Sequence, residues 1–110
     1  MIDFETAQRV ISERLAKMER NMNDFGSALP DYKDQPHLHL VVTKTTEYDF
    51  GWVFAYNTKE YSETNIISYA LAGNAPLIVD KTDGQVYATG TARPVEHYIE
   101  EYRKGVKIRA

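Results

Sequence analysis

Three histidines are the side chains of this sequence best suited to chemistry, because imidazole binds metals and transfers protons near neutral pH. They are His37, His39 and His97. His37 and His39 are two residues apart, so on a strand their rings would point the same way. A metal site needs further ligands, and no spacing requires His97 or a carboxylate to join them. The sequence therefore predicts no metal site and two ordinary strand histidines on a partly hydrated face.

Paired carboxylates are the second possible source of chemistry, and they occur at Asp80 with Asp83 and at Glu100 with Glu101. A general acid and base need surroundings that push their pKa values apart, whereas these pairs are expected on a turn and on a hydrated helix face. The sequence has no cysteine, no G-x-S-x-G elbow and no phosphate-binding loop. We expect no enzymatic activity and no cofactor.

Tyrosines interleaved with acids are more suggestive of function. The chain has eight tyrosines and one tryptophan, residue types that are enriched where proteins meet other proteins. Some of these aromatic residues fit a core, but others lie in or beside polar segments that also carry acids. The residues that we predict to contact a partner protein are Tyr48, Asp49, Glu60, Tyr61 and Glu63. The alternative is that they are exposed residues without a function.

Charge is distributed unevenly along the 110 residues, whose formal net charge is −3. Residues 21–80 carry an excess of acids and residues 81–110 an excess of bases. A nucleic-acid binder would concentrate Lys and Arg on one face, so we exclude nucleic acid as a partner. The acidic middle is either ordinary solvated surface or a face that steers a basic partner toward the protein.

The length bounds the architecture, because about 110 residues suffice for one hydrophobic core. We expect a single domain over residues 1–110. No apolar run approaches the roughly 20 residues of a membrane span, and the N-terminal residues lack a cationic, apolar leader. These features predict a cytoplasmic protein that does not contact a membrane.

A long helix is expected near the N-terminus. Its apolar residues recur at steps of three and four, at Phe4, Ala7, Ile11, Leu15, Met18 and Met22. Asp3 is a suitable N-cap, and Asn21, Asn23 and Gly26 mark the end of the helix. Residues 24–35 are then expected to form an exposed connection.

Two strands follow in the pattern. Residues 37–48 alternate as a strand, with Leu38, Leu40 and Val42 on one face. Residues 48–51 reverse the chain into a second strand, where Trp52, Phe54 and Tyr56 share a face opposite Val53, Ala55 and Asn57. Residues 58–68 are either a long loop or a loop that contains a short edge strand.

A hairpin and a helix complete the chain. Residues 77–80 and 85–89 are expected to pair across a turn at residues 81–84, where Asp83 and Gly84 suit a reversal. Pro94 then begins a helix that carries Val95, Tyr98, Ile99 and Tyr102 at helical spacing. The predicted fold is α+β, in the order α-β-β-β-β-α, with the first helix packed on a four-stranded antiparallel sheet in two layers.

A long stretch of the second half resembles the YrhB-like proteins, or immunity protein 35 family, of bacterial polymorphic toxin systems. The matching residues run from Leu71 to Lys81, and continue with Asp83-Gly84, Gly90-Thr91-Ala92 and residues 96–102. Upstream, Gly51-Trp52-Val53-Phe54 and Tyr56 are similar to the aromatic strand of the family. The resemblance implies an immunity protein that binds and neutralises a cognate toxin domain.

The same resemblance implies an alternative, a small chaperone-like holdase. A holdase needs an exposed apolar patch for unfolded clients. The apolar positions here are mostly used by the helix stripe and by one face of the sheet, so we favour the immunity function.

Overall fold

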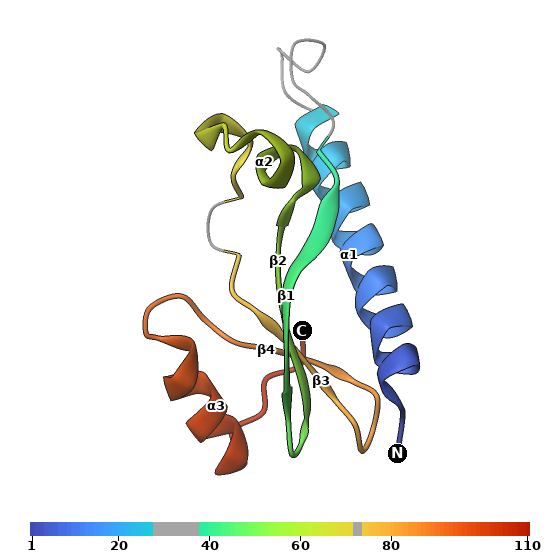
Figure 1. Cartoon of the computed structure of the whole chain (residues 1–110), viewed down its shortest axis with the longest axis vertical. Coiled ribbons are helices and arrows are strands. Elements are labelled where there is room, and N and C mark those ends of the chain that lie inside the picture. Colours follow the sequence, from blue (N-terminus) through green and yellow to red (C-terminus); the bar gives the residue numbers. More distant parts are fainter. Residues whose placement is uncertain (28–37, 72–73) are drawn as a thin grey trace.

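The computed structural model describes residues 1–27, 38–71 and 74–110. Its elements, shown in Figure 1, are α1 (Phe4–Ser27), β1 (Leu40–Tyr48), β2 (Gly51–Thr58), α2 (Lys59–Thr64), the 3-10 helix η2 (Ile67–Tyr69), β3 (Leu77–Asp80), β4 (Val86–Ala88) and α3 (Val95–Arg103). The strands form one antiparallel sheet in the order β1-β2-β3-β4. The predicted α+β class is confirmed, and so is the order of the long helices and strands. The helix α2 and η2 are additions to it.

The helix α1 begins as predicted, because the carboxylate of Asp3 accepts the backbone N–H of Thr6 at 2.8 Å. Its stripe places Ala7, Ile11 and Leu15 in a core with the apolar residues of the sheet. Of the three residues predicted to mark its end, Asn21 and Asn23 lie inside the helix, and Gly26 lies one residue before its end at Ser27. Of the connection expected at 24–35, residues 24–27 are therefore helical and the rest lie outside the described residues.

Both predicted hairpins are present. The chain reverses between Tyr48 and Gly51, which are cross-strand partners in β1 and β2. Gly51 has a φ of +151°, and a Cβ there would stand 2.1 Å from the carbonyl oxygen of Val79 on β3. Only glycine therefore fits at this position. The second turn places Gly84 at a φ of +68° between β3 and β4.

A bulge in β1 changes which face its side chains take. Val42 pairs with Tyr56, but the next partner of Ala55 is Lys44, so the register shifts between Val42 and Lys44. Because one extra residue reverses the alternation, Leu40 packs on the α1 side while Tyr48 packs on the other side. Regular alternation, as the sequence predicted for residues 37–48, holds only on either side of this bulge.

The second helix of the predicted order, α3, covers the sheet face opposite α1 (Figure 1). Its Ile99 and Tyr102 pack with Val53, Ile78 and Tyr87 in a second core. The sheet therefore lies between two helices. The α1 layer was predicted, but the fold has three layers rather than the predicted two. This follows from the alternation of β2, which buries residues on both of its faces.

The last residues extend the sheet edge, which the sequence did not predict. The N–H of Ala88 donates to the carbonyl of Ile108 at 2.7 Å, and the N–H of Ala110 donates to the carbonyl of Val86 at 3.0 Å. Arg109 forms an isolated antiparallel bridge with Tyr87. Within the described ranges, no helix combines the length and the apolar character that a bilayer crossing requires.

Candidate protein-binding surface

The short helix α2 is built around Thr58, the last residue of β2. Thr58 is fully buried, and its hydroxyl oxygen accepts the backbone N–H of Tyr61 at 3.0 Å. The same hydroxyl donates to the carbonyl oxygen of Tyr69 at 2.6 Å. Asn65 ends the helix in the left-handed conformation, with a φ of 57°. One buried side chain thus ties β2, α2 and η2 together.

Three of the five predicted contact residues, Glu60, Tyr61 and Glu63, lie on α2. The carboxylate of Glu60 accepts two hydrogen bonds from His39, one from the ring Nδ1 at 2.6 Å and one from the backbone N–H at 3.1 Å. Glu63 lies 3.8 Å from the ammonium of Lys59, one turn away. Tyr61 is partly exposed between them. The structure therefore brings these three together on one small helix.

The contact between His39 and Glu60 shifts the pKa values of both groups. The hydrogen bond that the His39 ring donates to the carboxylate of Glu60 raises the pKa of His39 above its ordinary value, because it favours the charged imidazolium. Burial alone would raise the pKa of Glu60, but the hydrogen bonds from His39 outweigh it and the pKa is lowered. Glu60 is therefore ionised at neutral pH.

Two isoleucines beside α2 are exposed. Ile66 is 48% exposed and Ile67 is 75% exposed, although isoleucine is among the residues most often buried. They precede and begin η2, where the N–H of Tyr69 donates to the carbonyl of Ile66 at 3.0 Å. The sequence predicted a long loop, or a loop with a short edge strand, over residues 58–68, and both alternatives were wrong, because this segment forms α2 and η2. The capping residues Thr58 and Asn65 were the signals of a short helix.

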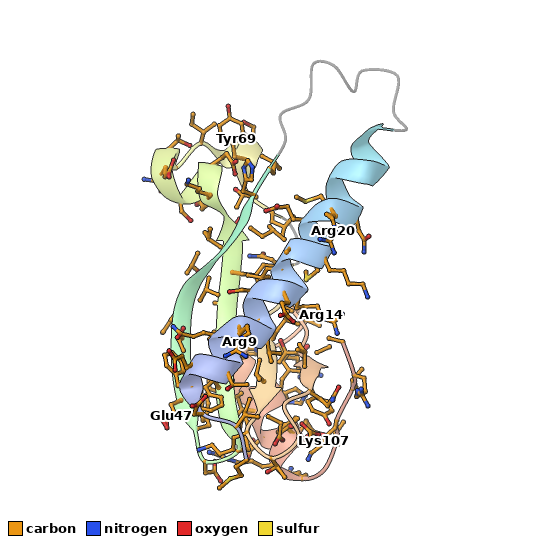
Figure 2. The ribbon with its side chains drawn as sticks, turned by 90° about the vertical axis from the view of Figure 1, so that its right-hand side faces the viewer. Arg9, Arg14, Arg20, Glu47, Tyr69 and Lys107 are labelled. Atoms are coloured by element: carbon orange, nitrogen blue, oxygen red, sulfur yellow. The ribbon has the colours of Figure 1, made fainter. Side chains whose placement is uncertain are left out.

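The other two predicted contact residues lie at the opposite end of β2, with Tyr48 as the last residue of β1 and Asp49 in the turn that follows. Figure 2 shows this separation, with Tyr69 at the α2 end and Glu47 at the turn end. The eight residues of β2 separate the groups by about 25 Å at roughly 3.3 Å per residue. The structure therefore does not bring Tyr48 and Asp49 to the residues of α2.

The side chain of Arg103 in α3 already contacts Tyr48 and Asp49. Its guanidinium donates to the carboxylate of Asp49 at 2.9 Å and lies 5.6 Å from the ring centroid of Tyr48. The hydrogen bond from Arg103 lowers the pKa of Asp49. The ring of Tyr48 also stacks on Phe50, with centroids 5.3 Å apart. These contacts join the turn to α3.

The carboxylates Asp80 and Asp83 lie near the same end, and each is bound to a tyrosine. Asp80 is buried and accepts the hydroxyl of Tyr102, while Asp83 accepts the hydroxyl of Tyr87 at 2.5 Å. The ammonium of Lys107 lies 3.8 Å from Asp80. Burial, and then the bond to Asp80, raises the pKa of Tyr102. These groups are paired with one another, as befits the structural role predicted for the two acids.

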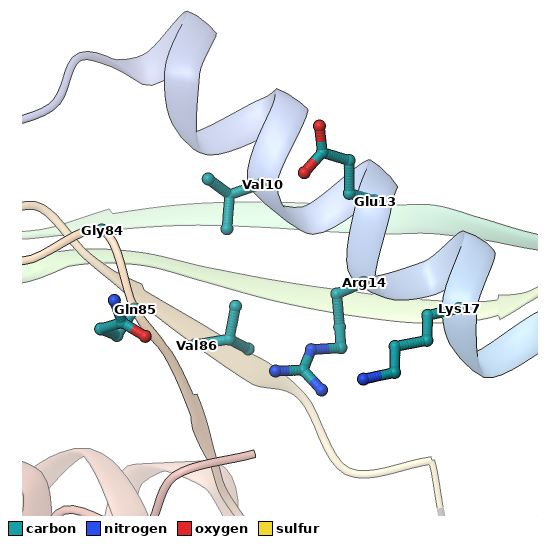
Figure 3. Close-up of a pocket in the computed structure, with 7 residues that line it drawn as sticks. All are labelled: Val10, Glu13, Arg14, Lys17, Gly84, Gln85 and Val86. Carbon is teal, nitrogen blue, oxygen red and sulfur yellow. The ribbon is translucent and has the colours of Figure 1, made fainter.

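A shallow cleft of about 270 Å³ lies between α1 and the edge of β4 (Figure 3). Its lining includes Val10, Arg14 and Lys17 from α1 and Val86 from β4. The guanidinium of Arg14 donates to the carbonyl oxygen of Ala110 at 2.9 Å. This hydrogen bond ties α1 to the C-terminal segment.

Two of the histidines considered for a metal site, His39 and His97, lie in different parts of the fold and have different partners. His39 is paired with Glu60 beside α2, and His97 lies on α3, where its ring contacts Tyr98 edge-on. His37 lies outside the described residues. In residues 1–27, 38–71 and 74–110, no group of three or more His, Cys, Asp or Glu residues could hold a metal ion.

Comparisons with known proteins add two matches. The sequence model of a family described as immunity protein 35 matches residues 12–105. An Escherichia coli (strain K12) protein, named as the uncharacterized protein YrhB, is 39% identical over 71 residues, which are 64% of this chain and 76% of that protein. No solved structure matches the chain.

Proposed function

The chain belongs to the immunity protein 35 family, and from this premise we propose that it is a cytoplasmic immunity protein that neutralises one cognate bacterial toxin domain. The observation that carries the proposal is the family match, which extends over residues 12–105. Neutralisation proceeds by steric occlusion, in which the bound protein covers the active site or the substrate channel of the toxin. No chemistry on the toxin is needed.

The acid and tyrosine residues of α2 are the contacts that we favour. Glu60 and Glu63 offer carboxylates that a basic partner would bind in place of their present partners, His39 and Lys59. Tyr61 offers amphipathic area at low cost in rotamer entropy. Since Tyr48 and Asp49 lie at the other end of β2 from this helix, we assign these two residues a secondary contact.

The distribution of exposed apolar side chains disfavours the holdase alternative. A holdase needs a contiguous apolar surface for unfolded clients. The large apolar residues that are exposed in the described part of the chain are Met1, Phe4, Val42, Ile66, Ile67, Val106 and Ile108. They come from distant parts of the fold, and only Ile66 and Ile67 form an adjacent pair beside acids. This pattern supports one specific partner rather than many clients.

Co-expression tests the proposal. The toxin domain encoded beside the gene of this chain is expressed with and without the chain in a sensitive bacterium, and the chain is then purified by a tag. We expect growth to be rescued and the toxin to co-purify in a stoichiometric complex. Continued killing, together with a lack of co-purification, would refute the immunity function. Suppression of the aggregation of unrelated heated proteins would instead favour the holdase.

A further inference from the structure

The sheet has two edges, and the described part of the chain covers only one of them. Residues 108–110 pair with β4, whereas β1 is the last strand on the other side. We propose that residues 44–48 of β1 are a docking edge, to which the toxin adds an extended segment that places Lys or Arg side chains against α3. The inference rests on the proposed immunity function and specifies the secondary contact at Tyr48 and the partner chemistry that it takes.

Among the described residues, nothing covers the outward backbone of residues 44–48. They pair in regular register with residues 51–55 of β2. No other described segment forms a backbone hydrogen bond with them. A row of unpaired N–H and C=O groups is recognised by the backbone of another extended chain. The bulge between Val42 and Lys44 interrupts the register, so the docking edge begins at Lys44.

A groove runs between this edge and α3, on the sheet face opposite α1. Figure 1 shows the two helices on opposite sides of β1 and β2. The groove consists of two adjoining clefts of about 190 and 250 Å³, which share Tyr48 and Glu96. Its apolar lining residues are Val53, Ala55, Pro76, Val95 and Ile99. Because side chains alternate along a strand, every second side chain of an added strand points to the groove side of the sheet.

The charges of the groove define the partner. Glu96 and Glu100 lie one turn apart on α3 and are exposed. Within residues 1–27, 38–71 and 74–110, neither carboxylate forms an ion pair. The guanidinium of Arg103 in the larger cleft is offset by Asp49, and Lys44 lines only the smaller cleft. The larger cleft therefore has two uncompensated carboxylates, which Lys or Arg side chains of the toxin complement.

The ring of Tyr48 lines both clefts and is already held in place. It stacks on Phe50 with centroids 5.3 Å apart, and the guanidinium of Arg103 lies 5.6 Å from its centroid. A side chain that is fixed in the free protein loses little conformational entropy on binding. Together with Ile99, the ring offers an apolar surface for the aliphatic stem of a Lys or Arg side chain.

The first measurement is the affinity of the full chain for the toxin domain encoded by the neighbouring gene, made catalytically inactive. The variant Glu96→Gln with Glu100→Gln removes the two carboxylates of the groove. The control Glu5→Gln with Glu13→Gln removes two exposed carboxylates from α1, on the other side of the sheet. We expect the groove variant to lose about fivefold in affinity, and the control to stay within about twofold of the wild type.

The second measurement is hydrogen exchange of the wild-type chain, free and in the toxin complex. We expect outward amides of residues 44–48 to exchange on the order of 10-fold more slowly in the complex, because they gain hydrogen-bond acceptors. The amides of residues 86–88, on the covered edge, are the control and should keep their rates. This measurement needs no variant, so it decides even if a substitution disturbs folding, which circular dichroism would reveal.

The outcomes separate this inference from the proposed function. If the wild type neutralises the toxin while the exchange of residues 44–48 stays unchanged in the complex, the docking edge is wrong and the immunity function stands. If the wild type neither binds nor neutralises the toxin, both fail. Equal losses of affinity in the two glutamine variants would reject the groove, because net charge alone would explain them. A free chain that sediments as a dimer with residues 44–48 already protected would assign the edge to a second copy and overturn the inference.

Discussion

The buried hydroxyl of Thr58 donates a 2.6 Å hydrogen bond to the carbonyl oxygen of Tyr69, eleven residues further along the chain. The same side chain caps α2. It therefore fixes the positions of α2 and η2 relative to β2. We expect its removal to lower both the stability of the protein and its affinity for a partner.

Replacing Thr58 with valine keeps the shape of the side chain and removes its hydroxyl. We expect the free energy of unfolding to fall by about 1–3 kcal/mol, because the helix loses its cap and the Tyr69 carbonyl loses its donor. Urea denaturation measures the loss. Thr45→Val, at an exposed position of β1, is the control, with an expected change within about 0.5 kcal/mol. Equal effects of the two substitutions would contradict this role of Thr58.

Gly51→Ala tests the close approach of the first turn to β3. The added methyl group meets the carbonyl oxygen of Val79 and stands on a positive φ, so we expect a loss of about 3 kcal/mol or more. Gly105→Ala is the control, because Gly105 also has a positive φ, of +99°, but a Cβ there meets nothing within 4 Å. It should cost about 1 kcal/mol, from backbone strain alone. Similar losses in urea denaturation would show that the contact with Val79 is unimportant.

Tyr102→Phe removes the hydroxyl that donates to the buried carboxylate of Asp80. A hydrogen bond to a charged group contributes more than a neutral one, so we expect a loss of about 2 kcal/mol in urea denaturation. Tyr98→Phe on the same helix is the control, since its hydroxyl makes no hydrogen bond to any described residue. A Tyr102→Phe variant as stable as this control would mean that the pair with Asp80 contributes nothing.

The contact between His39 and Glu60 makes stability depend on pH. The folded pKa of His39 is raised above 6.5, so its contribution is complete below about 6.5 and is lost as the pH rises through the folded value. The folded pKa of Glu60 is lowered below 4.5, so its contribution is present above 4.5 and is lost as the pH falls. The pair is therefore most stabilising between about pH 4.5 and pH 6.5, where both contributions are present.

Titration of the His39 ring by NMR checks this directly. In Glu60→Gln the pKa of His39 should return toward 6.5, because the charged acceptor is gone. In Glu63→Gln, on the same helix, it should stay at the wild-type value. An unchanged pKa of His39 in Glu60→Gln would show that the two groups do not interact in solution.

Alanine substitutions at the two ends of β2 test which predicted residues contact the toxin. We expect Tyr61→Ala with Glu63→Ala to weaken toxin binding by about 10-fold or more. Tyr48→Ala with Asp49→Ala should have a smaller effect, of about threefold, because Arg103 already engages both side chains. Calorimetric titration with the inactive toxin domain measures both. The reverse order would move the interface to the turn.

The parts of the fold that were predicted have strong local signals. Asp3 before a regular stripe marks the start of α1, and the Asp83-Gly84 turn fixes the second hairpin. The helix α2 was missed because it has only six residues and buries none of them. Its stability comes from Thr58 and from the distant carbonyl of Tyr69, which no periodicity reveals.

Other differences between prediction and structure arise from contacts between distant segments. The bulge at Val42 and Lys44 depends on how β1 pairs with β2, and the residues themselves carry no signal for it. The pairing of Ile108 and Ala110 with β4 likewise needs the completed sheet edge. For the candidate site, Glu60, Tyr61 and Glu63 are neighbours in the sequence itself, and their role as contacts stays a prediction. Tyr48 and Asp49 lie at the other end of β2 from α2, so the five predicted contact residues do not form one surface.

The hydrogen bonds by which Asn57 and Thr58 support α2 and η2 each have a main-chain atom as the partner. Thr58 binds the amide of Tyr61 and the carbonyl of Tyr69, and Asn57 binds the amide of Leu71. Any residue other than proline supplies such an amide, and every residue supplies the carbonyl. The exposed side chains can thus be substituted while the hydrogen bonds of Asn57 and Thr58 to the main chain are kept. Homologues that keep Asn57 and Thr58 can therefore change the exposed side chains at this end of the molecule, and so bind a different toxin, without changes elsewhere in the fold.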